Sequence, residues 1–471
     1  MTTMSKLQVA RESSRPGWAD LPCDLLESVL GRLPVPDRLR VPAVCTAWQS
    51  ATRAPLLQNY QPAPPPSPWL MLPFNPTAHR QHRQRTTSDD DSNSKLSARF
   101  LSLTEGSGGR TYAIRQPLPA VSDRLCIGSS PDGWLVTADN VSELHLLNPV
   151  TGAQVPLPSV TTLPYVDATS DGRVVSYSLR FSCCFTEEED DDEVMIPPET
   201  FAAEELRYEI YDKAVVLSPP RGSSLDLDGY AVLLICQPLS RLAVARDGDT
   251  AWTLLDTPGR CWADAVCASS EPRVVYTMDT AGRVDAWDMT AAPPSSRTIA
   301  PPCFCCCTGM SASCRNKYLV ELSSPPGRLL QVHRIREAAH ARYKWWEPRP
   351  DRVQYTTTKV ELFEWTGGQR WAQLDSSNNR TDGVLAGRAL FLGKSASLCV
   401  PADGLPTMIH GNCVYFTDDG PWSRDRCREV APDVGVLDLA DGTYRPPRAA
   451  VRDLLWKWPP PVWVFPSLAP S

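Results

Sequence analysis

The sequence has 471 residues, enough for one large domain and a smaller second one. Its 47 basic and 54 acidic residues leave a formal net charge of −7, which argues against a nucleic-acid binder that relies on bulk positive charge. A hydrophobic content of 42% with 21% charged residues favours a packed core and argues against wholesale disorder.

No segment of the sequence is typical of a membrane span or an export signal. The longest apolar run, Tyr230 to Cys236, is far shorter than the ~20 residues that cross a bilayer, and residues 1–18 contain no apolar block. The 16 cysteines are well below the ~8–10% share found in disulfide scaffolds, so we expect most of them to be reduced and buried. These features predict a protein of the nucleus, the cytoplasm or both, with no membrane partner.

Residues 18–54 carry helical periodicity. Apolar side chains recur with the spacing of one helical face at Leu21, Leu25, Leu26, Val29, Leu30 and Leu33. Prolines at 34 and 36 should end this helix, and two further helices are expected at 37–41 and 44–52. A unit of fewer than about 40 residues rarely forms a self-sufficient core, so this one is expected to need a partner.

The motifs within residues 18–54 resemble an F-box. They are the Leu21-Pro22 opening, the Leu25-Leu26 pair, a later leucine and the Val44-Cys45-x-x-Trp48 segment. The resemblance implies a Skp-type adaptor as the partner and, through it, a cullin. The residues that it assigns to adaptor binding are Leu21, Pro22, Leu25, Leu26, Leu30, Leu33, Val44, Cys45 and Trp48.

Two points qualify the helical region. Pro42 departs from the family pattern, and we expect it to be tolerated as the first residue of the third helix. On periodicity alone, the apolar stripe also fits an ordinary helical cap on the larger domain.

The rest of the chain divides by composition. Residues 1–17 are expected to be disordered, 55–68 to be a proline-rich linker and 69–468 to form one large domain. Two polar or acidic inserts, near 79–95 and 186–199, are expected to be disordered loops of that domain.

From Phe100 to Thr443 the sequence alternates short strands with turns. Turn residues recur at Asp132-Gly133, Asp247-Gly248 and Asp441-Gly442, among others. Repeated hairpins without sustained helix predict a β-propeller, which keeps exposed strand edges short over several hundred residues. A pair of stacked β-sandwiches is the alternative.

Segments near the C-terminal end are similar to a plant family of KIB-type β-propellers. They are residues 392–400, 411–419, 435–443 and 459–468. Members with this arrangement are plant F-box proteins, so the resemblance implies an intracellular, non-catalytic substrate receptor of a Skp-cullin-F-box ubiquitin ligase. The expected fold is α+β and multidomain, with a small three-helix F-box before a large all-β propeller. The competing function is a propeller that binds a protein or a small ligand outside any ligase.

The sequence predicts no catalytic residue, metal ion or cofactor, and it assigns no residue to the target protein. The segment Gly387 to Ser395 nearly spells a phosphate-binding loop, but it has five residues between its glycines where four are required, and a strand is expected after it. Cys303 and Cys306 form a Cys-x-x-Cys without the second pair that a zinc site needs.

Overall fold

The chain divides into two units, each taken by itself below: Met1–Pro65 with Leu468–Pro470, and Pro66–Ser467. The computed structural model describes residues 17–18, 21–33, 35–52, 68–72, 97–103, 109–115, 124–170, 175–180, 197–218, 229–238, 240–257, 259–268, 271, 273–291, 293–303, 314–322, 327–338, 355–365, 367–368, 370–374, 384–402, 409–419, 432–445 and 460–466. The predicted tail at 1–17, the linker at 55–68 and the insert near 79–95 therefore lie almost wholly outside the described residues.

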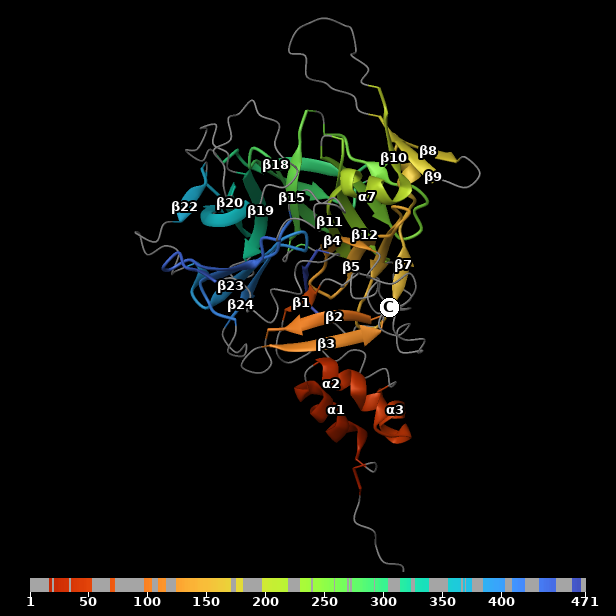
Figure 1. The fold of residues 1–471 in the computed structure, drawn as a ribbon. Coiled ribbons are helices and arrows are strands. Elements are labelled where there is room, and N and C mark those ends of the chain that lie inside the picture. Colours follow the sequence, from red (N-terminus) through yellow and green to blue (C-terminus); the bar gives the residue numbers. More distant parts are fainter. Residues whose placement is uncertain are drawn as a thin grey trace, which may run out of the picture. The chain divides into compact units, whose positions relative to one another are not determined.

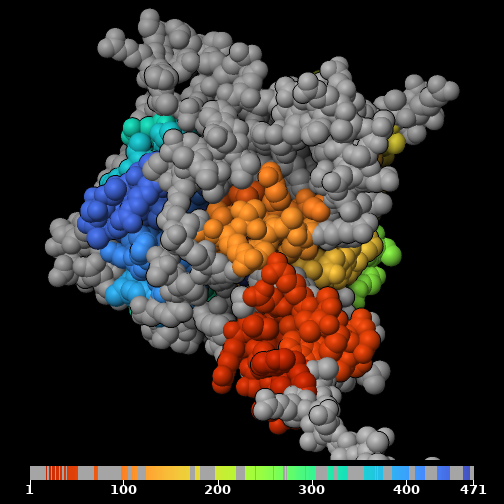
Figure 2. Space-filling model, turned by 60° about the horizontal axis from the view of Figure 1, so that its bottom comes forward, coloured from red at the N-terminus to blue at the C-terminus, as the bar shows by residue number. Residues whose placement is uncertain are grey.

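The described part of the first unit is helical. Its elements are α1 (Cys23–Arg32), α2 (Val35–Arg40), the 3-10 turn η2 (Val41–Ala43) and α3 (Thr46–Thr52). Helix α1 begins after Pro22, whose lack of an N–H costs nothing there because the first amides of a helix have no intrahelical acceptor. It ends where Leu33 turns to extended geometry and donates its N–H to the Leu30 carbonyl, at 3.2 Å. In Figure 2 the described atoms of this unit, in red, form one continuous body.

The expectation for Pro42 was wrong in its detail. Pro42 lies in η2, between α2 and α3, and helix α3 begins only at Thr46. The 3-10 turn accommodates proline because Pro42 stands in the first positions of the turn, where an N–H has no partner to lose. A tight turn thus replaces the expected first residue of the third helix.

The second unit is built from short strands (Figure 1). In the first half of the unit they are β1 (Trp69–Leu72), β2 (Ser97–Ser102), β3 (Arg110–Arg115), β4 (Leu125–Ser129), β5 (Leu135–Ala138), β6 (Leu144–Leu147), β7 (Gln154–Pro156), β8 (Val166–Ser170), β9 (Val175–Leu179), β10 (Glu199–Ala202), β11 (Tyr211–Ser218), β12 (Ala231–Cys236), β13 (Arg241–Arg246) and β14 (Thr253–Leu254). In the second half they are β15 (Trp262–Cys267), β16 (Val274–Asp279), β17 (Val284–Asp288), β18 (Ser295–Ala300), β19 (Cys314–Leu322), β20 (Arg328–Ala338), β21 (Tyr355–Trp365), β22 (Ala372–Leu374), β23 (Arg388–Leu392), β24 (Leu398–Pro401), β25 (Cys413–Phe416), β26 (Gly435–Asp438), β27 (Tyr444–Arg445) and β28 (Val462–Val464).

These strands form repeats that succeed one another along the chain. Four sheets have four or five strands each, in the orders β28-β1-β2-β3, β15-β16-β17-β18, β19-β20-β21-β22 and β24-β23-β25-β26-β27. An eight-stranded sheet consists of two further groups, β4 to β7 and β11 to β14, joined where β4 and β11 pair in parallel at Ala214↔Gly128 and Val215↔Ser129. The described residues therefore contain six repeats of this kind.

The repeats are arranged radially. In each repeat, one strand at or near the inner edge is here called the leading strand, and the leading strands of successive repeats contact one another. In order, these strands are β28, β4, β11, β15, β19 and β24. An apolar cluster that includes Leu70, Phe391 and Trp463 connects the last repeat to the first, and β28 pairs with β1, so the two ends of the unit share one sheet. This order is that of a β-propeller, as predicted, and it differs from the facing layers of stacked sandwiches.

An insertion separates the second repeat from the third. It contains the 3-10 turn η4 (Val160–Thr162), the three-stranded sheet β8-β9-β10 and helix α7 (Ala203–Ile210). The predicted acidic insert near 186–199 falls here; its last residue, Glu199, is the first residue of strand β10, and residues 181–196 lie outside the described part of the chain.

Glycines with positive φ stand in the hairpin turns, and tryptophans are part of the core. The predicted turn at Asp132-Gly133 has a φ value of 84° at its glycine. At Gly282 φ is 85°, and a Cβ there would stand 2.7 Å from the Gln331 amide oxygen. Trp252, Trp262, Trp287 and Trp365 are buried, as plugs within or between sheets should be. None of the described helices has the length and apolarity needed to cross a bilayer.

Candidate functional sites in the helical unit and at the propeller mouth

The helical unit has a small apolar core of its own. Leu26, Leu30 and Val41 are 1%, 7% and 3% exposed, and Leu21, Leu33 and Trp48 pack against them. The Trp48 indole N–H donates to the Trp18 carbonyl at 2.8 Å. These six apolar side chains form the core of the described helices.

Three large apolar side chains in the described part of the unit are exposed, and Trp18 is the most exposed of them at 75%. Leu25 is 52% exposed and Val44 is 59% exposed. The expectation that the periodic leucines of the first helix share one face fails at Leu25, because it stands about 100° around the helix from Leu26, and the core is too narrow to cover both. Pro22 is also exposed, and Cys45 is half-buried, close enough for its sulfur to accept from the Trp48 amide at 3.5 Å.

Apart from the half-buried Cys45, the residues assigned to adaptor binding form two groups. Leu21, Leu26, Leu30, Leu33 and Trp48 pack with one another inside the unit. Pro22, Leu25 and Val44 remain available to another molecule within the described part of the chain. Exposed large apolar side chains on so small a unit are the pattern expected of a contact surface.

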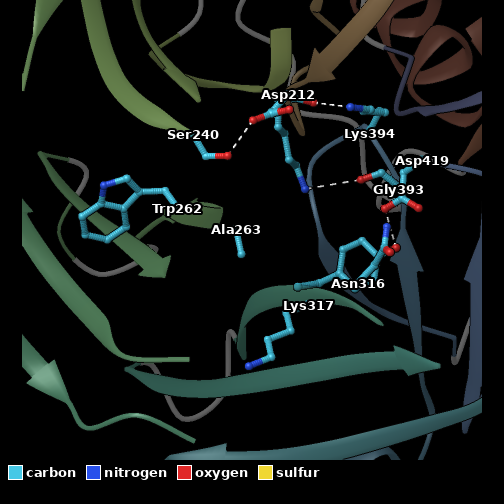
Figure 3. A pocket seen from close by; sticks show the side chains of 11 residues that line it. Asp212, Ser240, Trp262, Ala263, Asn316, Lys317, Gly393, Lys394 and Asp419 are labelled. Atoms are coloured by element: carbon cyan, nitrogen blue, oxygen red, sulfur yellow. Dashed lines mark hydrogen bonds between the residues drawn. The ribbon is translucent and has the colours of Figure 1, made fainter. Parts of the chain in front are cut away.

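A second candidate site is a polar cavity of about 340 Å³ in the propeller (Figure 3). Its lining residues come from the repeats that begin at β11, β15, β19 and β23: Asp212, Lys213, Ser240, Trp262, Ala263, Asn316, Lys317, Tyr318, Gly393, Lys394 and Asp419. Most of them stand near the starts of the leading strands or, in the last repeat, just after β23 and β25. The cavity therefore lies at one mouth of the central channel, where the leading strands enter.

A buried ion pair forms one wall of this cavity. The Lys213 ammonium donates to Asp264 Oδ1 at 2.8 Å, to Ser397 Oγ at 3.2 Å and to the Gly393 carbonyl at 3.3 Å. Asp264 in turn accepts from Ser397 Oγ at 2.8 Å and from the Leu319 amide at 2.9 Å. Each N–H of Lys213 has an acceptor, so this pair connects the repeats and has no capacity left for a ligand.

The Asp419 carboxylate is paired within a second network of hydrogen bonds and ion pairs. Tyr318 donates its hydroxyl to Asp419 Oδ2, and Arg334 contacts Oδ1 at 3.4 Å while also binding Asp433 at 2.7 Å. Burial alone would raise the pKa of Asp419, but the guanidiniums of Arg334 and Arg336, with the hydrogen bond from Tyr318, hold it below its ordinary value. Both oxygens of this carboxylate are therefore occupied by the protein.

Lys394 and Asp212 differ from these saturated groups. Lys394 donates one N–H to the main-chain carbonyl of Asp212, and within the described residues its other two N–H groups have no acceptor. Within the part of the chain that the structure describes, the side chain of Asp212 accepts from Gln237 at 2.9 Å and from Ser240 at 2.8 Å, both through Oδ2. Burial lowers the pKa of Lys394, although Asp212 and Asp419 act in the opposite direction.

Sequence reasoning missed this cavity. In the sequence, the segment that ends in Gly393-Lys394-Ser395 drew attention only as a near match to a phosphate-binding loop, and its spacing argued against that. The strand expected after this segment is confirmed as β24. No group of His, Cys, Asp and Glu side chains in the described residues could hold a metal ion. Cys306 of the Cys-x-x-Cys lies outside those residues, and Cys303 is buried.

Comparison with known proteins relates both units to described families. The KIB1-4 beta-propeller family model matches residues 100–438, and an F-box-like model matches residues 18–58. Among Arabidopsis thaliana proteins, the chain is 23% identical to the F-box protein SKIP23 over 95% of each chain. It is 25% identical to the putative F-box protein At4g22660 over 34% of this chain, a match that spans only 36% of that relative. A solved nidogen/laminin complex aligns with 64% of this chain and 89% of its own at 10% identity, with a TM-score of 0.27 that is too low to argue from.

Proposed function

Because the chain belongs to the KIB1-4 β-propeller family and carries an F-box-like segment before the propeller, we propose that it is the substrate-recognition subunit of a Skp-cullin-F-box ubiquitin ligase. The observation that carries the proposal is this pairing of segments in one chain, which the F-box protein SKIP23 matches over 95% of its length. Relatives in Arabidopsis thaliana that are named as F-box proteins support the same role.

In this proposal the three helices of the first unit are those of an F-box. Leu26, Leu30 and Val41 hold the unit together, while Leu25, Val44 and Pro22 contact a Skp-type adaptor that itself binds a cullin. Full burial of an aliphatic side chain is worth about 1.5–3 kcal/mol, so Leu25 and Val44 together supply a substantial part of such a contact before association costs.

The propeller binds the target protein, and the chain performs no chemistry of its own. Rate enhancement of ubiquitin transfer comes from holding a target lysine close to a charged enzyme that another subunit supplies. We expect this to happen in the nucleus, the cytoplasm or both, which the distribution of a fluorescent fusion in cells tests.

Adaptor co-purification tests the proposal. Leu25→Asp and Val44→Asp place a charge on exposed apolar positions and should each weaken adaptor binding at least tenfold, because the buried carboxylate would have no partner. Ser50→Asp adds the same charge to an exposed polar position of helix α3 and serves as the matched control.

Leu30→Asp is a less informative variant, since Leu30 belongs to the core and its loss should unfold the helices. Failure of the wild-type chain to bind any Skp-type adaptor would refute the ligase role and favour a propeller that binds its partners outside a ligase. Equal adaptor binding by the wild type, Leu25→Asp, Val44→Asp and the Ser50→Asp control would refute the assigned surface.

A further inference from the structure

The charged side chains that line the cavity at the propeller mouth are three lysines and two aspartates, so their formal sum is positive. Lys213 and Asp419 are matched by protein groups, and the Lys317 ammonium donates to the Thr280 carbonyl at 2.7 Å. Lys394 and Asp212 complete the set.

The hydrogen-bonding groups left over at Lys394 and Asp212 also favour an anionic ligand, because donors outnumber acceptors. Lys394 keeps two N–H donors without an acceptor in the described residues, whereas Asp212 keeps one oxygen, Oδ1, outside its bonds to Ser240 and Gln237. An ammonium that is half-buried and incompletely bonded binds an anionic acceptor more strongly than an exposed one does, because less water competes for it.

The size and position of the cavity fit one side chain of a larger molecule. Its volume of about 340 Å³ is near the lower end of the ~300–1,000 Å³ of ligand sites, and it stands at the mouth of the central channel, where four repeats contribute to the lining. Figure 3 shows Lys394 beside Asp212 at one side of this space and Lys317 at the other.

We propose that this cavity receives one anionic side chain of the target protein, a carboxylate or a phosphorylated residue, which binds the Lys394 ammonium. The inference rests on the proposed function, since it takes the bound molecule to be a protein. Asp212 opposes such a ligand through its unbonded oxygen, so Lys394 and Asp212 act on affinity in opposite directions.

A peptide-library measurement on the complex of the full chain with its Skp-type adaptor tests this assignment. Pools of degenerate peptides carry one fixed central residue: glutamate, aspartate, phosphoserine, glutamine or lysine. The wild-type complex should retain at least one anionic pool about ten- to hundredfold more strongly than the glutamine pool, as a charge-assisted hydrogen bond predicts. The glutamate and aspartate pools report a carboxylate and the phosphoserine pool a phosphate.

Variants of Lys394 and Asp212 should change the preference for anionic peptides in opposite directions. Lys394→Met should reduce the anionic pools to the level of the glutamine pool, Lys394→Arg should keep part of the preference, and Asp212→Asn should strengthen it. The matched control is Lys359→Met, which removes an ammonium from strand β21, where Lys359 is 61% exposed and outside the cavity. Loss of folding cannot produce opposite changes in Lys394→Met and Asp212→Asn, and thermal unfolding of each variant checks the fold directly.

Equal retention of the glutamine or lysine pool by the wild-type complex would overturn the inference, as would an anionic preference that survives Lys394→Met. Adaptor co-purification in the same preparations tests the ligase role separately from the cavity assignment. A complex that forms but shows no anionic preference refutes the cavity assignment alone. A chain that shows the preference but never binds the adaptor refutes the ligase role and leaves the cavity assignment supported.

Discussion

Replacing Asp264 should destabilise the propeller more than any exposed charge does. Asp264 is fully buried on strand β15, and it binds Lys213 of β11, the Leu319 amide of β19 and Ser397 just before β24. Asp264→Ala leaves the Lys213 ammonium buried without its counter-charge, a change that costs about 3–5 kcal/mol. It also removes the acceptor of the Leu319 amide, which adds ~1–3 kcal/mol if nothing replaces it.

Urea unfolding followed by tryptophan fluorescence measures this loss as a lower midpoint at unchanged slope. The matched control is Arg445→Ala, which breaks an exposed pair with Asp438, 2.9 Å apart, worth about 0–1 kcal/mol. Asp264→Asn keeps an acceptor but loses the charge, and it should fall between the two. A shift for Asp264→Ala no larger than that of Arg445→Ala would show that the pair does not connect the repeats.

Three further outcomes are expected. Because the folded-state pKa of Asp419 lies below its ordinary value of 3.8, its stabilising effect is present at neutral pH and is lost as the pH falls through that lowered pKa; the difference in urea midpoint between wild type and Asp419→Asn should shrink between pH 6 and pH 3, and a constant difference would contradict this. Burial raises the pKa of Cys126 and of Cys236 to about 12, so neither thiol should react with a disulfide reagent at pH 8 until urea unfolds the chain, as peptide mapping of the labelled sites would show. Gly282→Ala should destabilise by more than the ~1 kcal/mol of an average substitution, because φ is positive and the new Cβ meets Gln331 and Cys303; thermal unfolding at wild-type temperature would refute that reading.

The helices and hairpins could be predicted because their signals are local. The spacing of Leu26 and Leu30 requires only a helical turn, and Asp132-Gly133 requires only the backbone freedom of glycine. The same reasoning failed for Leu25 and Pro42. The width of the helix face that is covered, and the position of the 3-10 turn, depend on the packing of neighbouring segments, which local spacing does not report.

The cavity could not be predicted for a related reason. Asp212 and Asp419 are separated by about two hundred residues, and only the radial order of the repeats brings them to one mouth. Lys394 stood out in the sequence solely through its neighbours Gly393 and Ser395, whose likeness to a phosphate-binding loop gave the wrong structural context for a residue that does line a polar site.

The pairing of β28 with β1 sets an order of events during synthesis. Strand β1 leaves the ribosome early, at residues 69–72, but its edge stays unmatched until residues 462–464 have been translated. Residues 23–52 have been translated throughout that interval, so under the proposed function adaptor binding does not have to wait for ring closure, whereas target binding by the propeller does.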